Sequence, residues 1–344
     1  MATSIKKRDV KKKNPALSAE ASEISSAQSS LISWYKDNHR DLPWRRTKDP
    51  YRIWISEVML QQTTVTAVLP YYDRFLQQFP SLRALASAPV ERVLESWSGL
   101  GYYSRARNLH KAAQALQDQK SFPRTAEELR NYPGFGPYTS RAVATFAFQE
   151  KVGVLDGNVI RLLSRFYGLP VQHWLPKGRN ILQEKADALA QTDEPDLLNQ
   201  GLIELGATIC SPQNPSCLLC PWAKSCVARK TDQIPKLPLK KPRALFETWL
   251  WKPEIHVKNG RIAFVVNDHM PFLKGQWILP GVSKKLDKKP KQFDVKCGVT
   301  RFDIYIQISK PQKAKSKCKW VPLEDVKKVN PTSLIQKVLQ QGLP

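Results

Sequence analysis

The chain has 344 residues, enough for two or three domains that each bury a core of their own. Its 54 Lys and Arg outnumber 30 Asp and Glu, and the net charge of +24 favours a polyanionic partner and salt-dependent binding. No apolar run approaches the roughly 18 residues that span a bilayer, and residues 1–28 lack the apolar stretch of a secretory signal, so we expect an intracellular protein with no membrane partner.

The basic charge is concentrated at the two ends. Residues 1–13 carry six basic side chains and one acidic, and residues 240–344 carry 22 basic and eight acidic. Residues 1–26 are rich in Lys, Ser and Ala, a composition that predicts a disordered basic arm. For a short run such as 11–13, a solvated surface is an equally good interpretation.

From residue 27 to residue 230 the pattern predicts successive helices. Leu31, Ile32 and Tyr35 recur at helical spacing, and turn signals such as residues 79–81 and 99–101 separate the segments. Glu57 would share a helix face with Ile53 and Val58, which makes it a carboxylate on an apolar stripe.

Burial of that kind raises the pKa of a carboxyl group towards the value that a general acid needs. The alternative for Glu57 is a helix-edge carboxylate paired with Arg52 or another base. The sequence alone leaves both interpretations open.

Residues 132–139, Tyr-Pro-Gly-Phe-Gly-Pro-Tyr-Thr, predict a tight hairpin between two helices. Gly134 and Gly136 permit the reversal, Pro137 suits a first helical turn, and the N–H groups there can face a phosphate. Such a turn would hold a DNA backbone without reading its sequence. A Gly-x-Gly turn between helices is also common where nothing binds.

Asp156 stands just before a predicted helix, in Leu155-Asp156-Gly157-Asn158. The ordinary role of a carboxylate there is to cap the helix. The functional alternative is that it faces a sugar and stabilises the positive charge that develops as a glycosidic bond breaks. One side chain can do both.

Four cysteines, separated by six, two and five residues, form the most specific pattern in the chain: Cys210, Cys217, Cys220 and Cys226. Thiolates so close together hold metal, because a soft, multiply charged centre offsets their repulsion. Structural zinc usually takes its ligands as two close pairs, so the uneven spacing favours a cubane iron–sulfur cluster. A zinc knuckle or unrelated thiols is the alternative, and Cys297 and Cys318 look like ordinary thiols.

Residues 231–243 predict an extended Pro/Lys linker. Beyond it, residues 262–266 and 302–308 have the composition of strands, and residues 334–339 predict a short terminal helix. The sequence therefore predicts an α-helical domain tethered to a small α+β domain over residues 244–344.

Taken together, these motifs resemble the helix-hairpin-helix DNA glycosylases, and within them the MutY-type, A/G-specific adenine glycosylases. The matching stretches span about residues 30–230: Leu42-Pro43-Trp44-Arg45, residues 54–63, residues 99–110, the hairpin, residues 155–158 and the four cysteines. The resemblance implies a monomeric enzyme with a [4Fe-4S] cluster, found with the DNA in a bacterial cytoplasm. It would release adenine mispaired with 8-oxoguanine or guanine from double-stranded DNA during base excision repair.

The resemblance also implies the catalytic roles. Glu57 protonates the flipped adenine at N7, and Asp156 stabilises the oxocarbenium ion, either as a nearby charge or by trapping it covalently. Tyr138 and Asn158 support this site. Bifunctional relatives carry a lysine at the place of Tyr138, which cannot form an imine, so the implied enzyme is monofunctional.

The substrate contacts follow from the same resemblance. The adenine pocket would be formed by Trp44, Arg45 and Gln200. The group that enters the duplex and contacts the opposite, oxidised guanine would comprise Gln62, Thr63, Leu100 and Tyr102. For Tyr102 taken alone, core packing is the ordinary alternative.

The implied helical core covers residues 27–230 in two halves. About residues 50–150 would form a six-helix half with the hairpin, and residues 27–49 and 151–230 the half with the cluster loop. Residues 244–344 resemble the Nudix-like domain with which relatives sense 8-oxoguanine, without its acidic hydrolase motif. Thr300 would contact the lesion, whereas Arg301 replaces a histidine of the relatives, which leaves the preference for 8-oxoguanine open.

Two other functions stay open at this point. A pyrimidine-damage glycosylase with lyase activity would share the fold, and Tyr138 argues against it. A catalytically silent or redox-active iron–sulfur protein that binds DNA is the other, and the presence of both Glu57 and Asp156 argues against it. Residues 211–216 contain no Lys or Arg, so the basic C-terminal domain would have to compensate for weak binding there.

Overall fold

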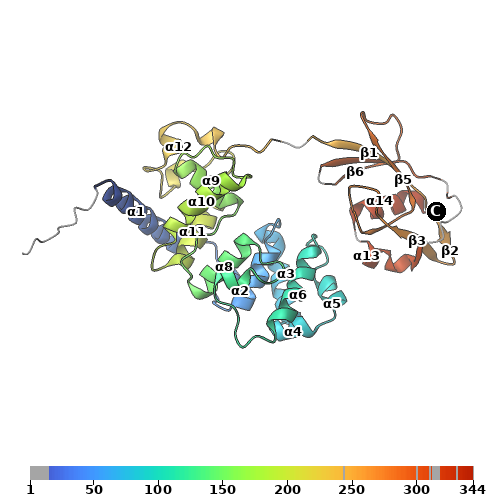
Figure 1. The fold of residues 1–344 in the computed structure, drawn as a ribbon, viewed down its shortest axis with the longest axis horizontal. Helices are drawn as coiled ribbons and strands as arrows, with labels where there is room; N and C mark the ends of the chain where they lie inside the picture. The colour runs from blue at the N-terminus through green and yellow to red at the C-terminus, as the bar shows by residue number, and fades with distance from the viewer. Residues whose placement is uncertain are drawn as a thin grey trace, which may run out of the picture. The chain divides into compact units, whose positions relative to one another are not determined.

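A computed structural model describes residues 15–242, 245–299, 301–309, 311, 318–330 and 332–343, with side chains from residue 21 onward. The chain divides into two compact units between Lys241 and Pro242. The first unit is helical and the second is built on β-sheets (Figure 1). Among the described residues, no helix is long and apolar enough to cross a membrane.

The α-helices of the first unit, in chain order, are α1 (Pro15–Asn38), α2 (Pro50–Met59), α3 (Val65–Gln78), α4 (Leu82–Ser87), α5 (Val90–Ser96), α6 (Ser104–Leu116), α7 (Ala126–Leu129), α8 (Pro137–Phe148), α9 (Gly157–Phe166), α10 (Pro176–Leu189), α11 (Pro195–Thr208) and α12 (Val227–Lys230). Short 3-10 turns occur at η1 (Pro43–Arg45), η2 (Cys217–Leu219) and η3 (Ile234–Lys236). The expected all-helical core is confirmed.

Two features of the helical unit differ from the expectation. Helix α1 begins at Pro15, so the prediction of a disordered arm is wrong for residues 15–26, and residues 1–14 lie outside the described part. Residues 50–150 hold seven α-helices instead of six, because Thr125 and Glu128 form a capping box that makes Ala126–Leu129 a turn of its own.

The predicted linker is only partly extended. Its first part forms the turn η3, and Leu237 is buried, with its carbonyl oxygen accepting a hydrogen bond from Arg165 Nε at 2.9 Å. Residues up to 237 therefore belong to the helical unit by packing, although the sequence places residues 231–237 in the linker.

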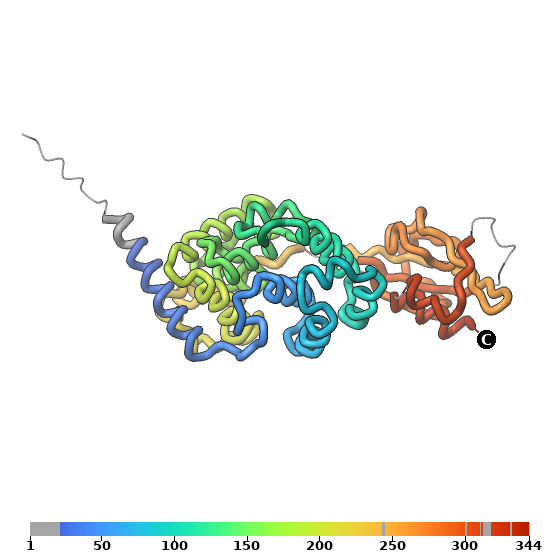
Figure 2. Tube along the Cα trace, turned by 90° about the horizontal axis from the view of Figure 1, so that it is seen from below, coloured from blue at the N-terminus to red at the C-terminus, as the bar shows by residue number. Residues whose placement is uncertain are grey.

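The helical unit has one continuous core that joins its two halves. Helix α8 packs against α2 on one side and α11 on the other, and α11 also contacts α1 and α9. In Figure 2, α1 (blue) lies beside α11 (yellow-green). Bulky side chains such as Trp54, Trp97 and Phe75 are fully buried, and burial of this much apolar surface is the main stabilising contribution.

The described residues of the second unit form two small sheets and two α-helices. Its elements are β1 (Glu247–Pro253), β2 (Val257–Lys258), β3 (Arg261–Val266), β4 (Trp277–Ile278), β5 (Gly281–Leu286), β6 (Val295–Val299), β7 (Phe302–Ile306), β8 (Lys319–Pro322), η4 (Leu323–Asp325), α13 (Val326–Val329) and α14 (Ser333–Gly342). One sheet has the order β5-β1-β7-β6, with β1 and β7 parallel, and β3 pairs with β2, β4 and β8 in the other. Trp251, Phe264 and Ile335 are in its core. The predicted strands and the terminal helix are present as β3, β7 and α14.

Candidate active site

A pocket of about 570 Å³ lies between η1, α2, α8, α11 and the start of α9. It brings together nine of the predicted site residues: Trp44, Arg45, Glu57, Gln62, Thr63, Tyr138, Asp156, Asn158 and Gln200. These residues are far apart in the sequence, so the fold assembles one site from both halves of the helical unit.

Glu57 is placed on the buried side of α2. Asp49 caps this helix by accepting a hydrogen bond from Tyr51 N at 2.9 Å, and Pro50 occupies its first turn. Glu57 is only 5% exposed, and its Oε2 atom has no hydrogen-bond partner among the described residues. The prediction of a carboxylate on an apolar stripe is confirmed, and the alternative pairing is wrong, because Arg52 pairs with Asp49 at 3.5 Å.

Burial raises the pKa of Glu57 to about 7. The hydrogen bond from the Tyr138 hydroxyl lowers this pKa, the charge of Asp156 raises it, and Arg45 lowers it again. The pKa of Tyr138 is raised well above its usual range, also by burial, so its hydroxyl stays neutral. Glu57 can therefore hold or release a proton near neutral pH.

Asp156 is both a helix cap and a pocket residue. Its Oδ1 accepts from Val159 N at 2.7 Å, and its Oδ2 accepts from Asn158 Nδ2 at 3.0 Å. Asn158 in turn accepts from Arg161 Nη2 at 3.0 Å. Burial raises the pKa of Asp156, while the hydrogen bonds from Val159 and Asn158 lower it. Both interpretations of this carboxylate are therefore compatible with the structure.

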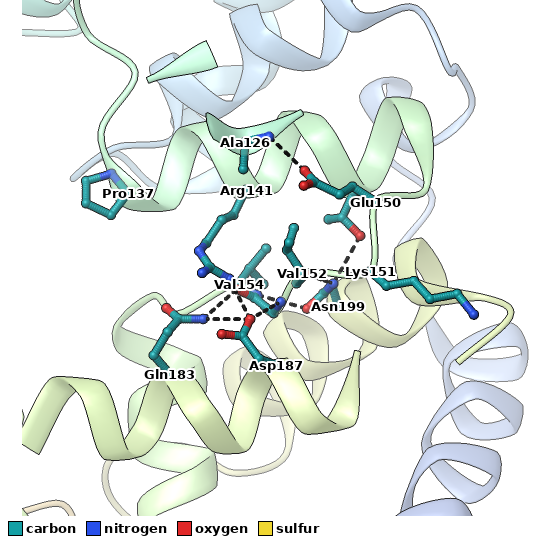
Figure 3. Close-up of polar contacts among 12 residues, drawn as sticks. Ala126, Pro137, Arg141, Glu150, Lys151, Val152, Val154, Gln183, Asp187 and Asn199 are labelled. Carbon is teal, nitrogen blue, oxygen red and sulfur yellow. Dashed lines mark hydrogen bonds and ion pairs between the residues drawn. The ribbon is translucent and has the colours of Figure 1, made fainter. Parts of the chain in front are cut away.

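The segment that carries Asp156 is held from two helices (Figure 3). Asn199 of α11 accepts from Val154 N at 3.0 Å and donates to Val152 O at 2.9 Å. Asp187 of α10 accepts from Gly153 N at 2.8 Å. A Cβ atom at Gly153 would lie 2.3 Å from the backbone carbon of Ala186, so only glycine lets the segment approach α10 so closely. Backbone and side chains thus fix where α9 begins.

A polar group that was not predicted, Glu204 with Arg40 and Arg45, lies beside the pocket. The Glu204 side chain is fully buried and accepts from Arg40 Nε at 2.8 Å and from Arg45 Nη2 at 2.7 Å. Burial alone would raise the pKa of Glu204, but these two arginines lower it to about 2. Tyr35 donates to Gln200 Oε1 at 2.7 Å, which leaves the amide nitrogen of Gln200 free to face the pocket. The four-residue spacing of Gln200 and Glu204 was the available signal, since it places both on one helix face.

Only some of the residues predicted to contact the opposite base line the same pocket. Gln62 and Thr63 line the main pocket, and Gln62 also lines a neighbouring pocket of about 290 Å³ with Tyr102. Tyr102 is 58% exposed, so the core-packing alternative for it is wrong. Leu100 is buried, with 7% of its surface exposed. Thr300 lies outside the described residues.

The predicted hairpin connects α7 to α8 and has the expected geometry. Gly134 has φ +85, a conformation that favours glycine, and Gly136 is the residue before the first turn of α8. Both glycines are exposed, and the neighbouring pocket extends to Gly134. The turn therefore presents backbone groups at the surface beside Tyr102.

The four cysteines line one pocket, together with apolar residues such as Phe166, Trp222 and Ile234. Arg165 Nη1 donates to Cys210 Sγ at 3.4 Å. Burial raises the pKa of Cys220 to about 11 and also raises the pKa of Cys226. Among the described residues, no group of three or more His, Cys, Asp or Glu has the arrangement of a single-ion site.

The helical unit, with its hairpin before α8 and its pocket of two carboxylates, has the architecture of the helix-hairpin-helix class. Residues 55–198 match the family described as HhH-GPD superfamily base excision DNA repair protein. The chain is 37% identical over 233 residues to adenine DNA glycosylase of Buchnera aphidicola subsp. Schizaphis graminum (strain Sg), covering 67% of each chain. It belongs to the adenine DNA glycosylase family.

A second relative agrees with this assignment, and a solved structure of a different glycosylase shares the fold. Adenine DNA glycosylase of Mus musculus is 41% identical over 228 residues, which cover 63% of this chain and 44% of the mouse protein. The chain thus matches less than half of the length of that mammalian relative. The solved structure of a thermostable thymine-DNA glycosylase superimposes with a TM-score of 0.57 at 28% identity, covering 62% of this chain and 99% of that one.

Proposed function

We propose that this protein hydrolyses the N-glycosidic bond of adenine mispaired with 8-oxoguanine or guanine in double-stranded DNA. One observation carries the proposal: a buried acid with a pKa of about 7, Glu57, shares a pocket with a second carboxylate, Asp156. Membership of the adenine DNA glycosylase family supports adenine as the base that is released.

The reaction would begin with adenine flipped into the pocket, which a mispaired base does at lower cost than a paired one. Protonated Glu57 donates its proton to N7, and the bonding electrons leave with the neutral base. The Asp156 carboxylate stabilises the positive charge left on the sugar. Water then adds to C1′, and the Glu57 carboxylate accepts the proton that this water loses.

The surrounding residues would orient the base and favour hydrolysis over strand cleavage. Tyr138 has no amine, so it cannot form an imine with the sugar, and its hydroxyl instead hydrogen-bonds to Glu57. Gln200 offers an amide N–H to an acceptor on the base, because its oxygen is occupied by Tyr35. Trp44 and Arg45 complete the adenine side of the pocket.

Binding of duplex DNA would use the exposed surface beside the pocket. Gly134 would hold the phosphate backbone through its N–H group, while Gly136, whose N–H donates to Gly134 O at 3.1 Å, would let the DNA backbone approach the turn closely. Tyr102 would stack into the duplex next to the opposite base. Gln62 and Thr63 would contact that base. We further propose that the second unit is Nudix-like and senses the lesion through Thr300; its mixed sheet with a parallel β1–β7 pair is compatible with this.

We also propose that Cys210, Cys217, Cys220 and Cys226 hold a [4Fe-4S] cluster. The four thiols line a single pocket, and a cubane cluster takes one thiolate on each of four irons, so its ligands surround a volume and do not converge on one point. Burial raises the pKa of the Cys220 and Cys226 thiols, and a cationic centre would make their thiolates favourable. The bound group would organise residues 210–226 and supply no proton or charge to the pocket of Glu57.

A single-turnover assay on a duplex with adenine opposite 8-oxoguanine tests the proposal. We expect the wild type to release adenine without borohydride-trappable adducts, and Glu57→Gln and Asp156→Asn to lose activity by at least about 10³-fold while they still bind the duplex. Release by Glu57→Gln at a near-normal rate would remove its role as the acid. Absence of adenine release by the wild type would favour a silent DNA-binding protein, and a trapped covalent adduct would favour a lyase.

A further inference from the structure

Arg105 connects the two loop segments that carry Gln62 and Tyr102. It lies in the first turn of α6 and is 9% exposed. Its Nη1 atom donates to the carbonyl oxygens of Val58 and Met59, each at 3.0 Å, and to that of Gln61. These three contacts hold the end of α2 and the start of the loop that follows it.

The second terminal nitrogen of the same guanidinium, Nη2, contacts the segment of residues 100–102. Nη2 donates to Leu100 O at 3.1 Å and Gly101 O at 3.3 Å, and also to Thr63 Oγ1 at 3.3 Å. The guanidinium carbon lies 5.4 Å from the centre of the Tyr102 ring. One planar group therefore links residues 58–63 with residues 100–102.

Each of the two segments contains a residue in a sparsely populated backbone conformation. Gln62 has φ +57 and Tyr102 has φ +48, and neither is a glycine. Left-handed conformations at such residues persist only where the surrounding structure holds them. In both segments the neighbouring carbonyl groups are those that Arg105 binds.

The contacts of Arg105 are suited to fixing geometry. Among the described residues, no carboxylate forms an ion pair with it, and it contacts carbonyl groups, one hydroxyl and the rings of Trp97 and Tyr102. A lysine would bring a single nitrogen on a flexible chain, which cannot satisfy two segments at once.

We propose that Arg105 is a positioning residue that holds Gln62 and Tyr102 in fixed relation to each other, and thereby sets the discrimination between bases opposite the adenine. This inference depends on the proposed function. It assigns Arg105 no part in breaking the glycosidic bond, because Arg105 lines the pocket of Tyr102 and not that of Glu57 and Asp156.

The test compares Arg105→Lys with wild type and with Leu116→Ala, which removes a buried side chain at the far end of the same helix. Single-turnover rates are measured for adenine opposite 8-oxoguanine and opposite guanine, and hydrogen exchange is measured without DNA. For Arg105→Lys we expect the ratio of the two rates to fall about tenfold or more and exchange to quicken in residues 58–63 and 99–105. Leu116→Ala should lower stability but keep both the ratio and this exchange pattern.

An unchanged rate ratio in folded Arg105→Lys would overturn the inference, as would an equal loss of ratio in Leu116→Ala. If Arg105→Lys does not fold, Arg105→Gln, which keeps a neutral donor, is measured with the same two readouts and the same criteria. A wild type that releases no adenine would defeat the proposed function, whereas unchanged exchange in both segments would defeat the positioning role by itself.

Discussion

Glu57 is an ionisable group that is buried in the helical unit, and its Oε2 atom has no hydrogen-bond partner among the described residues. Such a group is uncommon in a protein core. Burial favours its neutral form, and this gives the side chain a proton to donate at neutral pH. The same burial makes its ionised form costly to the folded state.

The rate of base release should depend on the protonation of both carboxylates, Glu57 and Asp156. As pH rises through about 7, Glu57 loses the proton that it must donate, so the single-turnover rate should fall. As pH falls, Asp156, whose pKa is also raised by burial, becomes neutral and the rate should fall again. A pH profile from 4.5 to 9 measures this, and a rate that stays constant above pH 8 would contradict the assignment of Glu57.

Glu57→Gln should be more stable than the wild type at neutral and alkaline pH. The folded-state pKa of about 7 lies above the ordinary value of 4.5, so wild-type stability falls as pH rises from 4.5 to 7 and is then constant. The amide avoids this loss, which we expect to be about 3 kcal/mol in the free energy of unfolding above pH 7. Urea unfolding at pH 5 and pH 8 measures it; a gap of the same size at both values would contradict it.

At the level of elements, the segment between α8 and α9 determines where Asp156 lies. Gly153→Ala would place a Cβ atom 2.3 Å from the backbone of α10, so we expect a loss of about 1–3 kcal/mol in stability and slower adenine release. At Gly157, in the first turn of α9, no atom lies within 4 Å of an added Cβ. Thermal unfolding of Gly157→Ala should therefore match the wild type, and an equal drop in both variants would refute this explanation.

The cysteine pocket gives a second prediction at this level. We expect the purified protein to contain about four irons and four acid-labile sulfides and to lose its visible absorption when Cys217 is replaced by Ala. Cys297→Ala should leave the iron content unchanged, because Cys297 lies in the core of the other unit. A metal analysis that finds one zinc and no sulfide per chain would contradict the cluster and indicate a zinc site.

The helices and the two carboxylates could be predicted from the sequence, but the residues that hold them in place could not. The apolar stripe around Glu57 and the cap at Asp156 depend on local spacing, so both could be predicted. The pairing of Arg40 with Glu204 and the contacts of Arg105 could not be found in this way, because Arg40 and Glu204 are 164 residues apart and most partners of Arg105 are backbone carbonyl groups. The start of α1 was not predicted: residues 21–26 are mostly exposed, and they continue a helix whose buried residues begin at Ala27.

At the scale of the whole molecule, both units have a net charge of +12, but the second unit is less than half as long, so its positive charge is denser. Residues 242–344 carry 20 basic and eight acidic side chains, whereas residues 211–216 of the cysteine loop carry none of either kind. Deletion of residues 242–344 should therefore weaken duplex binding and flatten its dependence on salt. Binding isotherms at several salt concentrations, with circular dichroism as the folding control, test this; an unchanged slope would place the electrostatic contacts in the helical unit.

The division into two units could be predicted from the sequence, but its position could not. Proline and lysine enrichment marks residues 231–243, yet Leu237 is buried and bonded to Arg165, so the boundary falls after Lys241. Composition indicates which residues can form an extended linker, whereas tertiary contacts determine which of them actually do.

The two carboxylates are supplied by opposite halves of the helical unit, Glu57 by α2 and Asp156 by the start of α9, with α8 packed between the halves. A slight rotation of one half against the other would separate an acid from its counter-charge without exposing the core. Function should thus be more fragile than the fold: in mild urea, turnover should disappear while the far-ultraviolet signal of the helices is still intact.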